Sequence, residues 1–143
     1  MAIAIVNTDI NIGPFKIPSN GQNMIMNNYA QRNNLHVEII IPEPMMSNEL
    51  ATTQWVHNDK KLTKVILCSI HQLPAKKSGI DELLNNMGDV EFHFAIEGIY
   101  GKGKNFLLER IEEAKIFMKA ESIDSTQTTW VKLHQLKQEI GTR

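Results

Sequence analysis

Short apolar runs alternate with amphipathic stretches along this chain. The runs are rich in Ile, Val, Leu and Phe and have the length of buried strands; they cover 2–7, 36–42, 64–70 and 90–96. The amphipathic stretches carry apolar residues at helical spacing; they cover 19–33, 47–61, 79–88 and 105–121. Four strand–helix repeats predict an α/β fold of three layers, with a four-stranded, mainly parallel sheet between helices.

Local signals suggest where the first helix begins and which side faces the core. Ser19 followed by Gln22 three residues later is typical of a capping box, in which both side chains satisfy free N–H groups of the first turn. Ile25, Met26 and Tyr29 are then expected to face inward. Residues 8–18 are expected to form a loop.

Two later segments carry more specific expectations. Ser47 is expected to cap the second helix, with Leu50 and Trp55 facing the core. The alternation of apolar and polar residues in 90–96 is typical of an edge strand, which would leave His93 partly exposed. Residues 97–104 contain three glycines and are expected to form a loop.

The chain divides into one domain over 1–121 and a C-terminal helix within 122–143. Ser125 is expected to cap this last helix and Gly141 to end it. Its apolar residues are at helical spacing, so it would pack either on the domain or on a second copy, forming a homodimer. A length of 143 residues suits a single core without disulfides.

Charge and composition exclude several kinds of partner. The net charge is −1, the isoelectric point is near 6.5 and only three arginines are present, so nucleic acid is not an expected partner. No apolar run approaches the roughly 20 residues that a membrane-spanning helix needs. The N-terminus does not resemble a signal peptide, and the single cysteine, Cys68, suits a reducing compartment. Together these features predict a cytoplasmic protein.

The expected site follows from the fold, because ligands of open parallel sheets bind beyond the carboxyl ends of the strands. The side chains delivered there by the four strands are Asn7, Glu43, Ser69, His71, Gln72 and Glu97. The first loop and the next helix start add Lys16, Ser19, Gln22 and Asn23. A helix N-terminus favours a negatively charged group, so Lys16 and Ser19 are candidates to hold one.

The segment KVILCSIHQ (64–72) is the centre of this prediction. His71 is the candidate acid or base, with Glu43 or Glu97 orienting it or sharing the proton transfer. Asn7, Gln22, Asn23, Ser69 and Gln72 are the candidate substrate-binding residues. An equally weighted reading is that Ser69, His71 and Gln72 only satisfy backbone groups as the chain leaves the sheet. No metal-binding or nucleotide-binding motif is present, so the sequence predicts no metal and no cofactor.

The order of elements resembles the catalytic domain of serine recombinases, the resolvases. The segment QNMIMNNYAQRNNL (22–35) after the first strand and the long helix after the fourth carry this likeness. That family uses a nucleophilic serine at the end of its first strand. The corresponding stretch here is IVNTDI and contains no serine, so the resemblance implies a resolvase-like or flavodoxin-like fold without recombinase chemistry.

A second resemblance is to the sporadic carbohydrate cluster protein family, small bacterial proteins encoded among genes for surface polysaccharides. The segments that carry it are 12–35, 65–75 and 92–99. The matching positions are Pro18, Gln22, Asn23, Tyr29, Ser69, Leu73, Pro74, His93, Phe94, Ala95 and Glu97. The resemblance implies a role in surface-glycan synthesis and places the site at the same sheet edge.

Three functions remain open from the sequence. The leading one is a protein that binds a sugar or nucleotide sugar, either without turnover or with acid/base chemistry on it. The second is a non-catalytic, resolvase-like binding or regulatory dimer. The third, nucleic-acid processing, is opposed by the near-zero charge and the few arginines.

Overall fold

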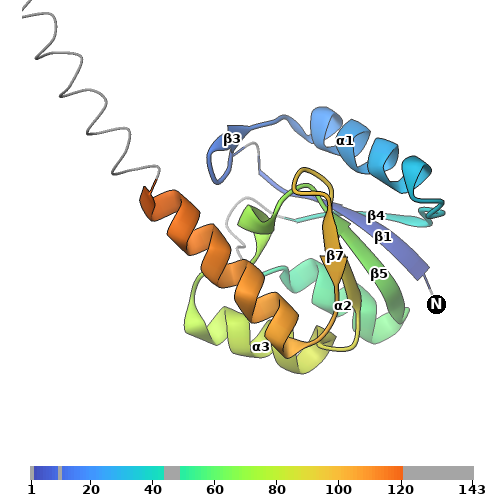
Figure 1. Ribbon diagram of the computed structural model, residues 1–143. Helices are drawn as coiled ribbons and strands as arrows, with labels where there is room; N and C mark the ends of the chain where they lie inside the picture. The colour runs from blue at the N-terminus through green and yellow to red at the C-terminus, as the bar shows by residue number, and fades with distance from the viewer. Residues whose placement is uncertain (1, 10, 44–48, 121–143) are drawn as a thin grey trace, which may run out of the picture.

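A computed structural model describes residues 2–9, 11–43 and 49–120 (Figure 1). Its main sheet has five strands in the order β4-β1-β5-β6-β7. These are β1 (Ala2–Asn7), β4 (Ile39–Pro42), β5 (Leu62–Leu67), β6 (Glu91–Phe94) and β7 (Ile99–Gly101). A hairpin of β2 (Asn11–Ile12) and β3 (Phe15–Lys16) forms a second, two-stranded sheet.

The parallel sheet predicted from the sequence is confirmed. Strand β1 pairs in parallel with β4 and β5, and β5 pairs in parallel with β6. The predicted third strand is therefore central. The sequence patterns predict neither strand β7 nor the hairpin, which both lie in segments expected to be loops. Because β7 pairs antiparallel with β6, the prediction that β6 lies at the sheet edge is wrong.

Helices cover both faces of the sheet, as expected for three layers (Figure 1). Helix α1 (Ser19–Arg32) lies on one face, where Met26 packs near Ile5 and Ile66. Helices α2 (Ala51–Asp59) and α3 (Lys77–Met87), together with a helix at residues 104–120, lie on the other. There Leu83 and Leu107 pack with Phe92 in the larger core.

Two local predictions on the helices are wrong. Pro18 is the cap residue of α1 and provides no side-chain cap, while Gln22 bonds to the preceding loop, so Ser19 and Gln22 form no capping box. Trp55 does not face the core, because 70% of its surface is exposed. Helix α2 begins at Ala51 and buries Thr53, Gln54 and His57 instead. The predicted cap Ser47 lies outside the described residues.

His93 is buried, contrary to its predicted partial exposure, because β7 covers this side of β6. Only 4% of its surface is exposed, and Tyr100 of β7 stacks on its ring with centroids 5.0 Å apart. Its Nδ1 lies 2.7 Å from the hydroxyl of Tyr29 in α1, and its Nε2 lies 2.7 Å from Glu91 Oε2. Glu91 also pairs with Lys64 at 2.8 Å. This chain of contacts joins α1 to the sheet.

Stability should fall in acid because His93 is buried in a neutral state. Burial lowers the pKa of His93 in the folded protein, although Glu91 opposes this shift. The unfolded state therefore takes up a proton first as the pH falls through about 6.5. We expect the urea midpoint to be constant above that pH and to fall below it, with a smaller decrease in His93→Gln.

The matched control for this experiment is His36→Gln, because His36 is exposed. Burial also lowers the pKa of His57, so the wild-type protein has a second contribution of the same sign. The quantity to compare is the decrease in the urea midpoint from pH 7.5 to pH 5, measured once for the wild-type protein and once for His93→Gln. An equal acid loss in both proteins would contradict the role given to His93.

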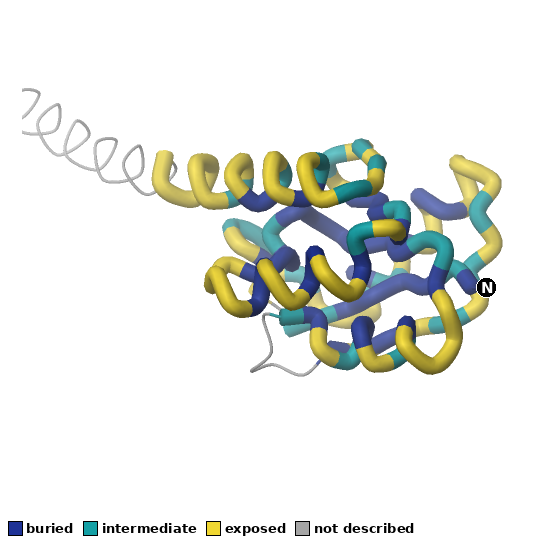
Figure 2. Tube along the Cα trace, turned by 90° about the horizontal axis from the view of Figure 1, so that it is seen from below, coloured by how far each residue is buried: buried dark blue, intermediate teal, exposed yellow. Residues whose placement is uncertain are grey.

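The helix at residues 104–120 extends beyond the domain. Its first half packs on the core through Leu107 and Ile111, whereas residues 115–120 are exposed (Figure 2). The strongly periodic helix predicted over 105–121 is confirmed across its described part. The predicted C-terminal helix lies outside the described residues. Within those residues, every helix is too short or too polar to span a membrane.

Candidate functional site

The chain turns sharply at the carboxyl end of β5, where the sequence placed the site. Ser69 caps a short 3-10 helix, η1 (Ile70–Gln72), and forms a capping box with Gln72. The Gln72 amide oxygen accepts hydrogen bonds from the backbone N–H of Cys68 at 2.7 Å and of Ser69 at 3.1 Å. Its amide nitrogen donates to the Val6 carbonyl at 3.2 Å. The Gln72 side chain therefore links the end of β5 to β1 by hydrogen bonds.

Ser69 and Glu97 form the closest pair of candidate site residues. The Ser69 hydroxyl donates to Glu97 Oε2 at 2.7 Å and accepts from the His71 N–H at 3.2 Å. Glu97 Oε1 accepts from the Ile70 N–H at 2.8 Å. Ser69 has no exposed surface. Glu97 thus holds η1 in place from the loop after β6.

Gln22 and Asn23 lie on α1 beside the carboxyl end of β1. The side chain of Gln22 is fully buried; its oxygen accepts from Thr8 N–H at 2.9 Å. Its nitrogen lies within hydrogen-bonding distance of the carbonyls of Thr8, Asp9 and Ile17, at 3.2, 3.0 and 2.8 Å. Asn23 accepts a 2.8 Å bond from Asn7, the residue that ends β1. These amides shape the loop that holds the hairpin.

Glu43 follows β4 and directs its carboxylate at the N-terminus of α2. Its Oε1 accepts from the Thr53 N–H at 2.7 Å and from the Thr53 hydroxyl at 2.6 Å, and its Oε2 accepts from the Thr52 N–H at 3.3 Å. Only 5% of Glu43 is exposed. Carboxylates are favourable at helix N-termini, so the observed contacts of Glu43 are those of a helix cap.

His71 is only half-buried and lies between the hairpin and the helix at 104–120. Its ring is edge-on to Phe15 at 6.0 Å and to Phe117 at 5.5 Å. Gly13 has a positive φ of 55°, and a Cβ atom there would lie 2.7 Å from His71 Nδ1, so only glycine fits. Lys16 and Ser19 are exposed on β3 and at the start of α1.

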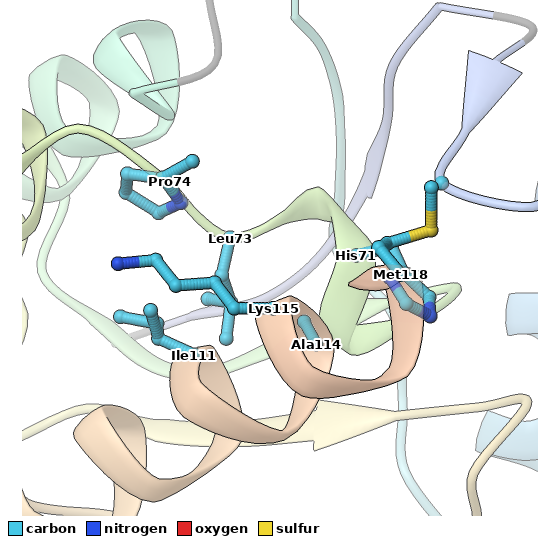
Figure 3. A pocket seen from close by; sticks show the side chains of 9 residues that line it. His71, Leu73, Pro74, Ile111, Ala114, Lys115 and Met118 are labelled. Carbon is cyan, nitrogen blue, oxygen red and sulfur yellow. The ribbon is translucent and has the colours of Figure 1, made fainter. Parts of the chain in front are cut away.

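A largely apolar cavity of about 330 Å3 opens beside His71. One wall is the segment after η1, and the other is the helix at 104–120 (Figure 3). In that view His71 and Met118 lie at one end, while Pro74 and the Lys115 ammonium lie at the other. The lining residues are Gly13, His71, Leu73, Pro74, Ala75, Ile111, Ala114, Lys115 and Met118. Its volume is at the lower end of the range for small-molecule sites.

Among these lining residues, only His71 is a predicted site residue, although Leu73 and Pro74 are positions that match the carbohydrate cluster family. The apolar spacing of Leu107, Ile111, Ala114 and Met118 was a usable signal, because four residues on one helix face imply a buried or covered stripe. No sequence pattern predicts that Gly13 lies against the His71 side chain, because this contact depends on the β2–β3 hairpin.

Two further observations concern the chemistry at this edge of the sheet. Burial, with a smaller contribution from Glu97, raises the pKa of Cys68 to about 12, so its thiol is not a reactive nucleophile. Its Sγ lies 3.5 Å from the carbonyl of Gln22. In the part of the chain that the structure describes, no group of three or more His, Cys, Asp or Glu could hold a metal ion.

Comparison with solved structures identifies the architecture. The N-terminal catalytic domain of the TP901-1 integrase aligns with a TM-score of 0.56 and 15% sequence identity. The alignment covers 83% of this chain and 98% of that domain. The fold is resolvase-like. This identity is too low to transfer an activity, so the likeness extends to the fold alone.

Comparisons by sequence add no family. No family model matches the chain, and no curated protein matches it. The resolvase-like fold predicted from the order of elements is confirmed, whereas no comparison supports the resemblance to the sporadic carbohydrate cluster family. The predicted site residues Asn7, Gln22, Asn23, Ser69, Gln72 and Glu97 do meet at one sheet edge. Their roles in binding or catalysis stay predictions.

Proposed function

We propose that this chain is a non-catalytic binding or regulatory protein with a resolvase-like fold. The proposal rests on one observation: the polar side chains at the carboxyl edge of the sheet form hydrogen bonds within the protein. Ser69, Glu97 and Gln72 bond to one another or to nearby backbone, and Glu43 caps α2.

A catalytic hydroxyl or carboxylate needs access to a substrate, and Ser69 and Glu43 have little. The Ser69 hydroxyl is unexposed and already both donates and accepts a hydrogen bond. Asn7 occupies the end of β1, where recombinases of this fold have their serine, and it is 7% exposed and bonded to Asn23. A carboxamide at this position is a poor nucleophile, which supports a binding role.

The second candidate is a protein of surface-glycan synthesis that binds a sugar or nucleotide sugar and acts on it by acid/base chemistry. Its support is the cavity beside His71, where an imidazole and the Lys115 ammonium lie in one small site. The ammonium could hold a sugar-linked phosphate at one end of the cavity, and the imidazole could transfer a proton at the other. Glu97 would then position η1, which carries His71.

One experiment separates the two candidates. The purified full chain is incubated with nucleotide sugars, sugar phosphates and nonulosonic acids, and both thermal shift and product formation are measured. A ligand at 100 times its dissociation constant adds about 2.7 kcal/mol to the free energy of unfolding. We expect no product from any compound. Product formation that disappears in His71→Ala, but persists in the exposed control His36→Ala, would overturn our proposal in favour of the sugar-processing candidate.

A further inference from the structure

The apolar stripe of the helix at residues 104–120 continues past the core of the domain. Leu107 and Ile111 are buried and Ala114 is half-buried, whereas Met118 is 40% exposed. These residues are four, three and four positions apart, so they lie on one helix face. The outer end of the stripe is therefore only partly covered: Met118 lines the cavity beside His71, and Figure 2 shows this end of the helix extending past the rest of the domain.

Ile111, Ala114 and Met118 of this stripe form one wall of the cavity of about 330 Å3, and Leu73, Pro74 and Ala75 form the other. We call this surface the 73–118 groove. At its Met118 end, Met118 is 40% and Phe117 is 50% exposed, and the Phe117 ring lies edge-on to His71. Contiguous exposed apolar surface of this kind is typical of interaction sites.

Lysines lie in the groove and next to its lining residues in the chain. Lys115 lines the cavity, Lys119 is one helical turn beyond it, and Lys76 and Lys77 directly follow the lining residue Ala75; all four are exposed. Lys115 is the only Asp, Glu, Lys or Arg among the described residues that line the cavity; Glu109, Glu112 and Glu113 of the same helix lie outside the lining, as do the other three lysines. The apolar cavity is thus lined by one cation and has lysines next to its lining residues on both walls, in a chain whose net charge is −1.

We propose that the 73–118 groove is the docking site for an amphipathic segment of a partner protein whose apolar side chains are flanked by Asp or Glu. This inference rests on the proposed function as a binding protein and assigns its partner class. Helices that lie in apolar grooves insert side chains at i, i+3, i+4 and i+7 spacing. Charges at an interface select the partner and speed its association, and here the lysines favour an acidic one.

Two synthetic peptides test the proposal directly. They have identical leucines at i, i+3, i+4 and i+7, and their remaining positions are Glu-rich in one and Lys-rich in the other. Binding to the full-length chain is measured by fluorescence anisotropy at low and high salt. We expect the Glu-rich peptide to bind more tightly, on the order of tenfold, with a preference that shrinks as salt screens the lysines.

Matched variants locate the binding. Met118→Gln removes an apolar lining residue, and Ile116→Gln is its control, because Ile116 is 64% exposed on the same helix and outside the cavity lining. We expect only Met118→Gln to weaken the Glu-rich peptide. The double change Lys115→Glu and Lys119→Glu should reverse the preference between peptides, whereas Lys60→Glu at an exposed position outside the groove should not.

Every other result overturns the proposal. Equal binding of both peptides, or no binding of either, contradicts an acidic partner. Neither result contradicts the proposed lack of catalysis, because product formation is measured in a separate experiment. Binding that appears only after Trp130→Asp and Leu133→Asp means that the chain's own C-terminal residues occupy the groove. A sedimenting dimer that Met118→Gln dissociates, but Ile116→Gln does not, means that a second copy occupies it.

Discussion

Replacing Gln22 by alanine is expected to lower the free energy of unfolding by about 4 kcal/mol, since each buried polar group left unpaired costs about 1–3 kcal/mol. The Gln22 side chain accepts from the Thr8 N–H and donates among the carbonyls of Thr8, Asp9 and Ile17. The alanine variant leaves these groups without their partner inside the fold. Urea unfolding of the wild-type and variant proteins measures the difference.

The control for Gln22→Ala is Gln31→Ala, because Gln31 is an exposed glutamine of the same helix. Surface substitutions of this kind change the free energy of unfolding by within about 0.5 kcal/mol. If the two variants unfolded at similar urea concentrations, the loop after β1 would not depend on Gln22. A large decrease in the free energy of unfolding would indicate that Gln22 is needed for stability, whether or not it contacts a ligand.

Glu43→Ala is expected to cost about 3 kcal/mol, because hydrogen bonds to a charged group contribute about 1.5–3 kcal/mol and two N–H groups of α2 lose their acceptor. The Thr53 hydroxyl loses its partner as well. Glu43→Gln keeps an acceptor oxygen and should cost less. Thermal unfolding of both variants, with circular dichroism to follow helix content, measures the effect.

Glu38→Ala is the control, since Glu38 is exposed just before β4. The sugar-processing candidate makes a different prediction for Glu43: loss of turnover with little loss of stability. A stable Glu43→Ala protein would therefore weaken the assignment of this carboxylate as the cap of α2. It would restore Glu43 as a candidate for proton transfer.

The elements that the sequence determined are those with strong short-range patterns. The run at 2–7 became β1 without change, and the periodic stretch after residue 104 is a helix. Apolar runs and 3.6-residue periodicity act within a few residues, so they can be read without knowing the neighbours. The position of the site edge also followed, because parallel strands bring their carboxyl ends together.

The elements that only the tertiary structure decided are short or depend on distant partners. The two-residue strands of the hairpin and the three-residue β7 carry no periodic signal, and β7 exists because β6 offers an unpaired edge. That same pairing buried His93 beneath Tyr100. Trp55 was misplaced because helical spacing alone does not say which stripe faces the sheet.

The roles of the polar residues were decided in the same way. The sequence determined that Gln22, Ser69 and Glu97 reach one sheet edge. Apart from the His71 N–H, which is two residues from Ser69, the hydrogen-bond partners of these side chains lie 5 to 28 residues away along the chain, so the fold selected them. The 73–118 groove likewise required the helix at 104–120 to pack beside the chain leaving β5. Local sequence sets which groups are available, and three-dimensional packing determines which of them remain open to a partner.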